Sequence, residues 1–268
     1  MNDLFTLKHL SGSTINAFIE RKHQFFASKI ERKPFKTNPN MCRGKAVEEI
    51  VNQWVNGREF SSNAELQQEA LLQYDKEMLE YVEITPSYIK EEDVIRTTVT
   101  DLAALAYNTY RTEIFPIHKP TSQKKIYYRY DGIDMDVVGI LDYHIPNKFV
   151  RDCKVVAKSA KKLSQGYCIT GAVYKAATGD DMIYDLFVAN KKVIHCPLKM
   201  TDEEFKFGLS YGAAAAKVLI ELRNCEDPVR LSQLWCFPDL DAVWDKTEKK
   251  ELADRWGIYL PKVESNEE

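Results

Sequence analysis

The chain has 268 residues, of which 44% are hydrophobic and 29% charged, and its formal net charge is −3. A chain of this length and composition can bury one core or two small ones, and it is too apolar for a disordered tail. The balance of 37 Lys and Arg against 40 Asp and Glu excludes a nucleic-acid binder of histone-like overall basicity, but it leaves local basic surfaces open.

Helical periodicity dominates the first part of the chain. Ser11 or Ser13 can cap a helix whose apolar positions run from Ile15 to Ile30. A segment rich in Pro and Asn, at 34–40, ends this helix, and a second helix is expected to begin near Gly44. Two further helices are expected at about 64–82 and 91–112.

The hydrophobic period changes to that of strands from Lys124. Two alternating runs flank Asp131-Gly132 and predict a hairpin, and a strand starting near Phe149 follows a turn at Pro146-Asn147. A helix at about 161–178, two more strands, and a long helix opened by a Thr201–Glu204 capping box complete the pattern. The expected fold is α/β or α+β, a mixed central sheet flanked by helices in one domain, with a mainly helical part (1–120), a sheet (121–200) and a C-terminal helical part (201–268).

The turn at Pro146 decides how two acidic residues face each other. A three-residue loop pairs Ile145 with Phe149 and places Asp142 opposite Asp152, with Lys154 on the same face. A two-residue loop would shift the register by one and remove this arrangement. Two facing carboxylates repel unless a cation lies between them, and oxygen ligands favour Mg²⁺ or Mn²⁺. Taken alone, Asp152 and Lys154 favour a solvated ion pair over a metal site.

Several motifs, in their order along the chain, resemble those of the PD-(D/E)xK nuclease superfamily, in particular its RecB-like and phage-exonuclease branch. The resemblance implies a restriction-endonuclease-like core and metal-assisted hydrolysis of DNA, as an exonuclease in phage or mobile-element recombination or repair. An endonuclease of the same fold and a non-catalytic nucleic-acid-binding module remain alternatives. The matching segments are Leu10–Phe18, Arg43–Glu48, Gly139–Asp142, Asp152–Lys154, and Gln165 with Tyr174.

The resemblance also implies a role for each matching residue. Asp142, Asp152 and the backbone carbonyl of Cys153 would hold the metal, and Lys154 would be the catalytic lysine. Glu48 would complete the metal site, with the adjacent Glu49 as an alternative, and Gln165 would position the lysine, the phosphate or the water. Nucleic-acid contacts are expected from Arg43, Lys158, Lys161, Lys162 and Tyr174.

Charge along the chain is uneven in a way that suits such a substrate. Residues 148–162 hold six Lys and Arg and one acid, which describes either a solvated face or a groove that follows phosphates. A Gly-x-Ser-x-Gly match at 208–212 is rejected as a hydrolase elbow, because a helix leads into it and no histidine follows.

The expected partners and location follow from the same observations. DNA is the expected partner and a membrane is not, while a homo-oligomer and a single-strand annealing or recombination protein are left open. The six cysteines form no C-x-x-C pair, so reduced thiols in a cytoplasmic protein are expected. Mg²⁺ or Mn²⁺ is the expected cofactor. An iron–sulfur cluster is not expected, because the cysteine of the iron–sulfur subfamilies is missing from the opening helix.

Overall fold

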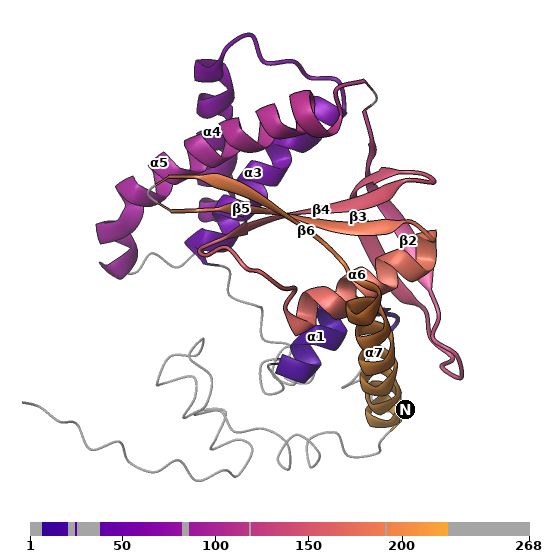
Figure 1. The fold of residues 1–268 in the computed structure, drawn as a ribbon. Coiled ribbons are helices and arrows are strands. Elements are labelled where there is room, and N and C mark those ends of the chain that lie inside the picture. Colours follow the sequence, from indigo (N-terminus) through magenta and orange to yellow (C-terminus); the bar gives the residue numbers. More distant parts are fainter. Residues whose placement is uncertain are drawn as a thin grey trace, which may run out of the picture. The chain divides into compact units, whose positions relative to one another are not determined.

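The computed structural model describes residues 7–20, 25, 38–81, 86–117, 119–190 and 192–224. The chain forms a mixed α/β fold in which a six-stranded sheet is flanked by helices, as the sequence predicts (Figure 1). The helices are α1 (Gly12–Glu20), α3 (Pro39–Val55), α4 (Asn63–Tyr81), α5 (Pro86–Asn108), the π-helical turn η1 (Thr109–Ile114), α6 (Gln165–Thr178) and α7 (Asp202–Arg223). The strands are β1 (Leu10–Ser11), β2 (Thr121–Tyr128), β3 (Val137–Ile145), β4 (Phe149–Val156), β5 (Asp181–Val188) and β6 (Ile194–Lys199).

The chain divides into two compact units, and the expectation of a single domain stays a prediction. The first unit contains α1, β1, the segment 129–137 and α7 from Leu209 onward. Within it, Ser11 caps α1 through its hydroxyl, and the Leu10 N–H donates to Asp136 O. The predicted continuation of the opening helix to Ile30, and the C-terminal part beyond 224, lie outside the described residues.

The second unit carries the sheet, and its strand order is β3-β4-β5-β6, with β2 also pairing with β3. β4 runs antiparallel to β3 and parallel to β5, so the connection through α6 is a crossover. The helices α3, α4 and α5 lie on one side of the sheet and α6 on the other (Figure 1). The core between α3, α4, α5 and the sheet includes Tyr143, Cys153 and Phe187.

Two helices of this unit begin earlier than the sequence predicts. The α3 helix begins at Pro39 instead of near Gly44, because the Asn38 side chain accepts the Met41 N–H and proline suits the first helical position. Helix α5 also begins at a proline, Pro86. In both places proline opens the helix instead of separating two elements.

The capping box predicted at the start of α7 is present in the structure. The Thr201 N–H and hydroxyl bond the Glu204 carboxylate, and the Glu204 N–H bonds Thr201 Oγ1, which is the predicted capping box. Gly208 lies inside α7, so the Gly-x-Ser-x-Gly match is helical and its rejection is confirmed. A Cβ at Gly208 would lie 2.1 Å from the Cys168 carbonyl oxygen, so this glycine permits close approach of the first turns of α7, up to residue 208, to α6.

Candidate active site

The β3–β4 hairpin has the register of the three-residue turn. Ile145 pairs with Phe149 and Tyr143 with Arg151, and Asn147 takes a left-handed φ of 62° in the turn. One further step along this register places Asp142 opposite Asp152. There the Asp142 carboxylate accepts the Cys153 N–H at 2.9 Å, so the side chain itself bridges the two strands. The predicted register is confirmed.

Three oxygen atoms converge on the Lys154 ammonium. Lys154 Nζ lies 2.5 Å from Asp152 Oδ2, 3.8 Å from Asp142 Oδ2 and 3.3 Å from the Cys153 carbonyl oxygen. Asp142 and Asp152 are buried, with exposed fractions of 8% and 2%. The structure therefore brings together the two acids, the carbonyl and the lysine that the sequence singled out.

Burial and mutual repulsion change the acid–base properties of this group. Burial, together with the nearby Asp152 charge, raises the pKa of Asp142 well above its ordinary value. Burial alone would lower the pKa of Lys154, but the Asp152 and Asp142 carboxylates outweigh it and raise that pKa well above its ordinary value. Lys154 is therefore a cation at neutral pH, and it offsets the two buried carboxylates.

Glu48 reaches the same group from α3. Burial raises the pKa of its carboxyl, while Lys154 lowers it and Asp152 raises it, so the three groups share one electrostatic environment. The Tyr143 hydroxyl donates to the Glu48 carbonyl oxygen at 3.4 Å, which ties this turn of α3 to the strand that carries Asp142. Glu49 instead accepts a hydrogen bond from Gln53 at 3.3 Å. Gln53 thus holds Glu49, whereas the Glu48 carboxyl interacts electrostatically with Lys154 and Asp152.

The donors suit a hard divalent cation in their chemistry. No three His, Cys, Asp or Glu side chains within the described residues are spaced to hold one ion as they stand. The two aspartates and the Cys153 carbonyl nevertheless offer oxygen atoms that already surround one cation, the lysine ammonium. Lys154 forms an ion pair with Asp152 Oδ2, but the geometry is not that of a hydrogen bond. This buried oxygen therefore has no hydrogen-bond partner and is available to bind a cation.

Gln165 and Tyr174, the two residues of α6 that the sequence predicts for the site, differ in their contacts with the aspartates and Lys154. Gln165 is the first residue of α6, after the Ser164 cap, and no hydrogen bond within the described residues joins it to the carboxylates or the lysine. Tyr174 is buried, and its ring lies against β3, where a Cβ at Gly139 would be 2.6 Å from Tyr174 Cε1. Burial, with the nearby Asp152 and Asp142 charges, raises the pKa of Tyr174.

Sequence reasoning missed Tyr167 and Tyr184. Burial raises the pKa of Tyr167, and Lys154 and Asp152 also act on it, so it lies near the charged group. Its ring stacks on Tyr184 with centroids 4.8 Å apart, and the Tyr184 hydroxyl donates to the Tyr167 carbonyl at 2.7 Å. Tyr167 and Tyr174 are seven residues apart and share a helix face, a spacing that could have identified Tyr167.

The predicted nucleic-acid-binding residues fall into two groups. Lys158, Lys161 and Lys162 are exposed, and the last two line a cleft of about 320 Å³ with Lys199. Arg43, in contrast, is 7% exposed, and its guanidinium donates to Thr98 and Asn40. These contacts give no support to a surface role for Arg43.

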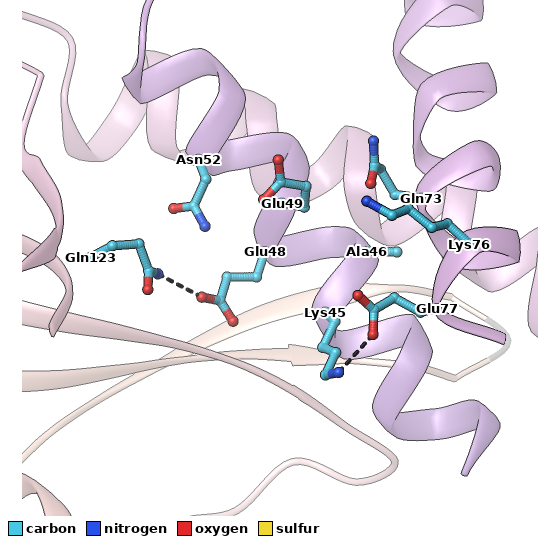
Figure 2. Close-up of a pocket in the computed structure, with 9 residues that line it drawn as sticks. All are labelled: Lys45, Ala46, Glu48, Glu49, Asn52, Gln73, Lys76, Glu77 and Gln123. Carbon is cyan, nitrogen blue, oxygen red and sulfur yellow. Dashed lines mark hydrogen bonds and ion pairs between the residues drawn. The ribbon is translucent and has the colours of Figure 1, made fainter. Parts of the chain in front are cut away.

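A polar cleft of about 440 Å³ adjoins Glu48 (Figure 2). It is lined from α3, α4 and β2 by Lys45, Ala46, Glu48, Glu49, Asn52, Gln73, Lys76, Glu77 and Gln123. Lys45 pairs with Glu77 at 2.6 Å across the cleft, and Gln123 donates to Glu48 at 2.9 Å. Sequence reasoning named only Glu48 and Glu49 among these residues as site candidates.

Comparison with known proteins shows a shared fold. No family model matches the chain, and no curated protein matches it. A solved structure from Eubacterium rectale, named "Putative exonuclease", aligns with a TM-score of 0.53 at 17% identity over 81% of this chain and 82% of that one. A second structure, SSO0001, aligns over 75% of this chain and 96% of that one at 11% identity, but its TM-score of 0.34 supports no argument. None of the helices in the described ranges combines the length and apolar character that crossing a membrane requires.

Proposed function

We propose that this protein is a metal-dependent nuclease of the PD-(D/E)xK type that degrades DNA as an exonuclease, in phage or mobile-element recombination or repair. The observation that carries the proposal is the convergence of oxygen atoms from Asp142, Asp152 and Cys153 on the Lys154 ammonium. Burial of two like charges side by side lowers the stability of the folded state. Such arrangements are typical of functional sites.

The Eubacterium rectale neighbour supports the nuclease class by its name and by a fold shared over most of both chains. The residue roles rest on the geometry of this chain, because the two proteins are only 17% identical. The ordered motifs from Arg43 to Tyr174 support the same class.

In this proposal Asp142, Asp152 and the Cys153 carbonyl hold Mg²⁺ or Mn²⁺. The bound ion supplies Lewis-acid polarisation of the phosphate and lowers the pKa of water. Lys154 donates hydrogen bonds as an ammonium, orients the attacking water and offsets negative charge that develops on the phosphate; its raised pKa argues against a role as general base. Glu48 completes the metal site from the α3 side, directly or through a water molecule.

The substrate strand is proposed to follow the exposed lysines after β4. Lys158, Lys161 and Lys162 lie just beyond the strand that carries Asp152 and Lys154, so they can contact phosphates next to the scissile one. Tyr167 and Tyr174 lie on the α6 side of the same group.

A nuclease assay tests the proposal. Purified protein should degrade end-labelled linear DNA with Mg²⁺ or Mn²⁺ and not with EDTA, and an Asp142→Asn variant prepared in parallel should be inactive. Covalently closed circular DNA should resist an exonuclease, whereas its cleavage would assign an endonuclease. Equal activity in the wild type and Asp142→Asn, or none with any metal on DNA or RNA, would reject the nuclease and favour a binding module.

A further inference from the structure

Gln123 holds the Glu48 carboxylate from a backbone conformation that glutamine rarely adopts. It lies in β2 with a φ of 53°, in the left-handed region that favours glycine. Its side chain is exposed, yet its amide donates to Glu48 Oε1 at 2.9 Å (Figure 2). A non-glycine residue held in this region, with its side chain aimed at a candidate catalytic acid, indicates a functional constraint on the position.

A second amide lies near the same carboxylate. Asn52 lies one turn after Glu48 on α3, lines the same cleft and acts to lower the pKa of the Glu48 carboxyl. Its Oδ1 is buried without a hydrogen-bond partner. The hydrogen bond from Gln123 on β2, a different element from α3, therefore restricts how the Glu48 carboxylate can rotate.

Gln73 offers a matched contrast within the same cleft. It comes from α4, and its amide donates to Glu69 at 2.8 Å instead of to Glu48. A change at Gln73 thus alters the charge of the cleft without touching the Glu48 contact.

We propose that Gln123 is a positioning residue, which fixes the Glu48 carboxylate beside Asp152 and Lys154 so that the acid is preorganised for the metal-loaded site. The inference rests on the proposed function and deepens it, since it assigns a residue that increases metal affinity through its hydrogen bond to Glu48. Removal of a hydrogen-bonding partner behind a metal ligand typically weakens metal affinity or activity about 10- to 100-fold.

The test measures Mn²⁺ binding by calorimetry, the Mg²⁺ concentration for half-maximal nuclease activity, and the melting temperature. Gln123→Gly removes the side chain and suits the positive φ, so its melting temperature should equal or exceed that of the wild type while Mn²⁺ affinity falls about 10-fold or more. Gln123→Glu should weaken Mn²⁺ binding more than Gln73→Glu, which adds the same charge to the same cleft. In a Glu48→Gln background, Gln123→Gly should have little further effect, because the partner is already changed.

The outcomes separate this inference from the proposed function. A wild type that binds Mn²⁺ and degrades DNA, with Gln123→Gly matching it in affinity and half-saturating Mg²⁺, would overturn the positioning role and leave the nuclease intact. Equal effects of Gln123→Glu and Gln73→Glu would overturn it too, because only cleft charge would then matter. A wild type that binds no Mn²⁺ and has no nuclease activity would overturn both.

Discussion

At the scale of single residues, Lys154 explains how two buried acids coexist. Its ammonium contacts Asp152, Asp142 and the Cys153 carbonyl, so the charge of the pair is offset by the chain itself. A divalent ion with the same oxygen donors could share this role, and the lysine would then be released toward water or phosphate. In the proposed function, catalytic and stabilising roles therefore meet in one side chain.

Two glycines of the second unit, Gly208 and Gly44, differ in how closely they are packed. Their replacement by alanine should therefore change stability in opposite directions. Gly208→Ala places a methyl group 2.1 Å from the backbone Cys168 oxygen, which cannot move as a side chain could. We expect it to lower the free energy of unfolding by about 3 kcal/mol or more. Gly44→Ala meets only Val155 Cβ at 3.9 Å inside a helix, so it should raise that free energy by about 0.5–1 kcal/mol.

Denaturant titrations of the two variants and the wild type measure both effects. A Gly208→Ala protein as stable as Gly44→Ala would show that α6 and α7 do not approach as closely as described.

Residue-level prediction from the sequence succeeded where the determinants are local. The Asp142–Asp152 placement followed from a three-residue loop at 146–148, and the structure has this loop and not the two-residue alternative that would shift the register by one. Gln123 could not be found in this way. Its partner lies 75 positions away, and its left-handed φ falls at a position that no sequence signal marked as special.

At the scale of elements, a buried carboxylate joins three strands and a helical turn. Asp185 on β5 is fully buried and accepts hydrogen bonds from Arg151 on β4, His195 on β6 and Tyr110 on η1, at 2.7–2.8 Å. Burial alone would raise its pKa, but the bonds from His195 and Arg151 prevail and lower it below the ordinary 3.8. The network was not predicted, because its four members come from four separate elements.

The lowered pKa of Asp185 predicts how stability depends on pH. A carboxyl with a lower pKa in the folded state stabilises that state above the unfolded pKa of 3.8, and this contribution is lost as pH falls through the folded pKa. Asp185→Asn should therefore lower the free energy of unfolding by about 3 kcal/mol at pH 7. The difference from the wild type should shrink below about pH 4.

Urea unfolding of both proteins at pH 7, 5, 4 and 3 tests this expectation. A difference that stays constant over the series would mean that the charge of Asp185 is not what stabilises the network.

The start of α7 was predicted correctly, whereas α3 and α5 begin earlier and α6 begins later than the sequence predicts. The Thr201–Glu204 box placed the start of α7 correctly, since both partners lie within one turn. Pro39 and Pro86 each open a helix, whereas the sequence pattern treated the segment at 34–40 as a break. Whether proline ends one helix or starts another depends on the flanking cap, here Asn38, more than on proline itself.

At the scale of the whole molecule, the net charge of −3 conceals an uneven distribution. Several acids are buried at Asp142, Asp152 and Asp185, where they are compensated by neighbouring cations. The lysines after β4 remain exposed to solvent. The proposed DNA substrate would therefore meet a local basic surface in spite of the acidic total.

Salt dependence tests that local surface. Replacement of Lys158, Lys161 and Lys162 by Ala should weaken DNA binding at low salt and reduce the slope of log affinity against log salt by about 0.9 for each phosphate that the variant no longer neutralises. Lys148→Ala serves as the control, because that residue lies in the turn at the other end of β4. Fluorescence anisotropy at several salt concentrations measures the slope. An unchanged slope in the triple variant would place the DNA elsewhere.

The most direct test of the central claim compares two aspartate variants in hydrolysis of linear DNA with Mg²⁺. Asp152→Ala removes an acid beside Lys154, whereas Asp181→Ala removes one on β5 that pairs with Lys199 at the surface. Both should remain folded by circular dichroism. The account predicts that Asp152→Ala lowers the rate at least about 100-fold while Asp181→Ala stays within a few fold of the wild type. Equal rates in the two variants would contradict it.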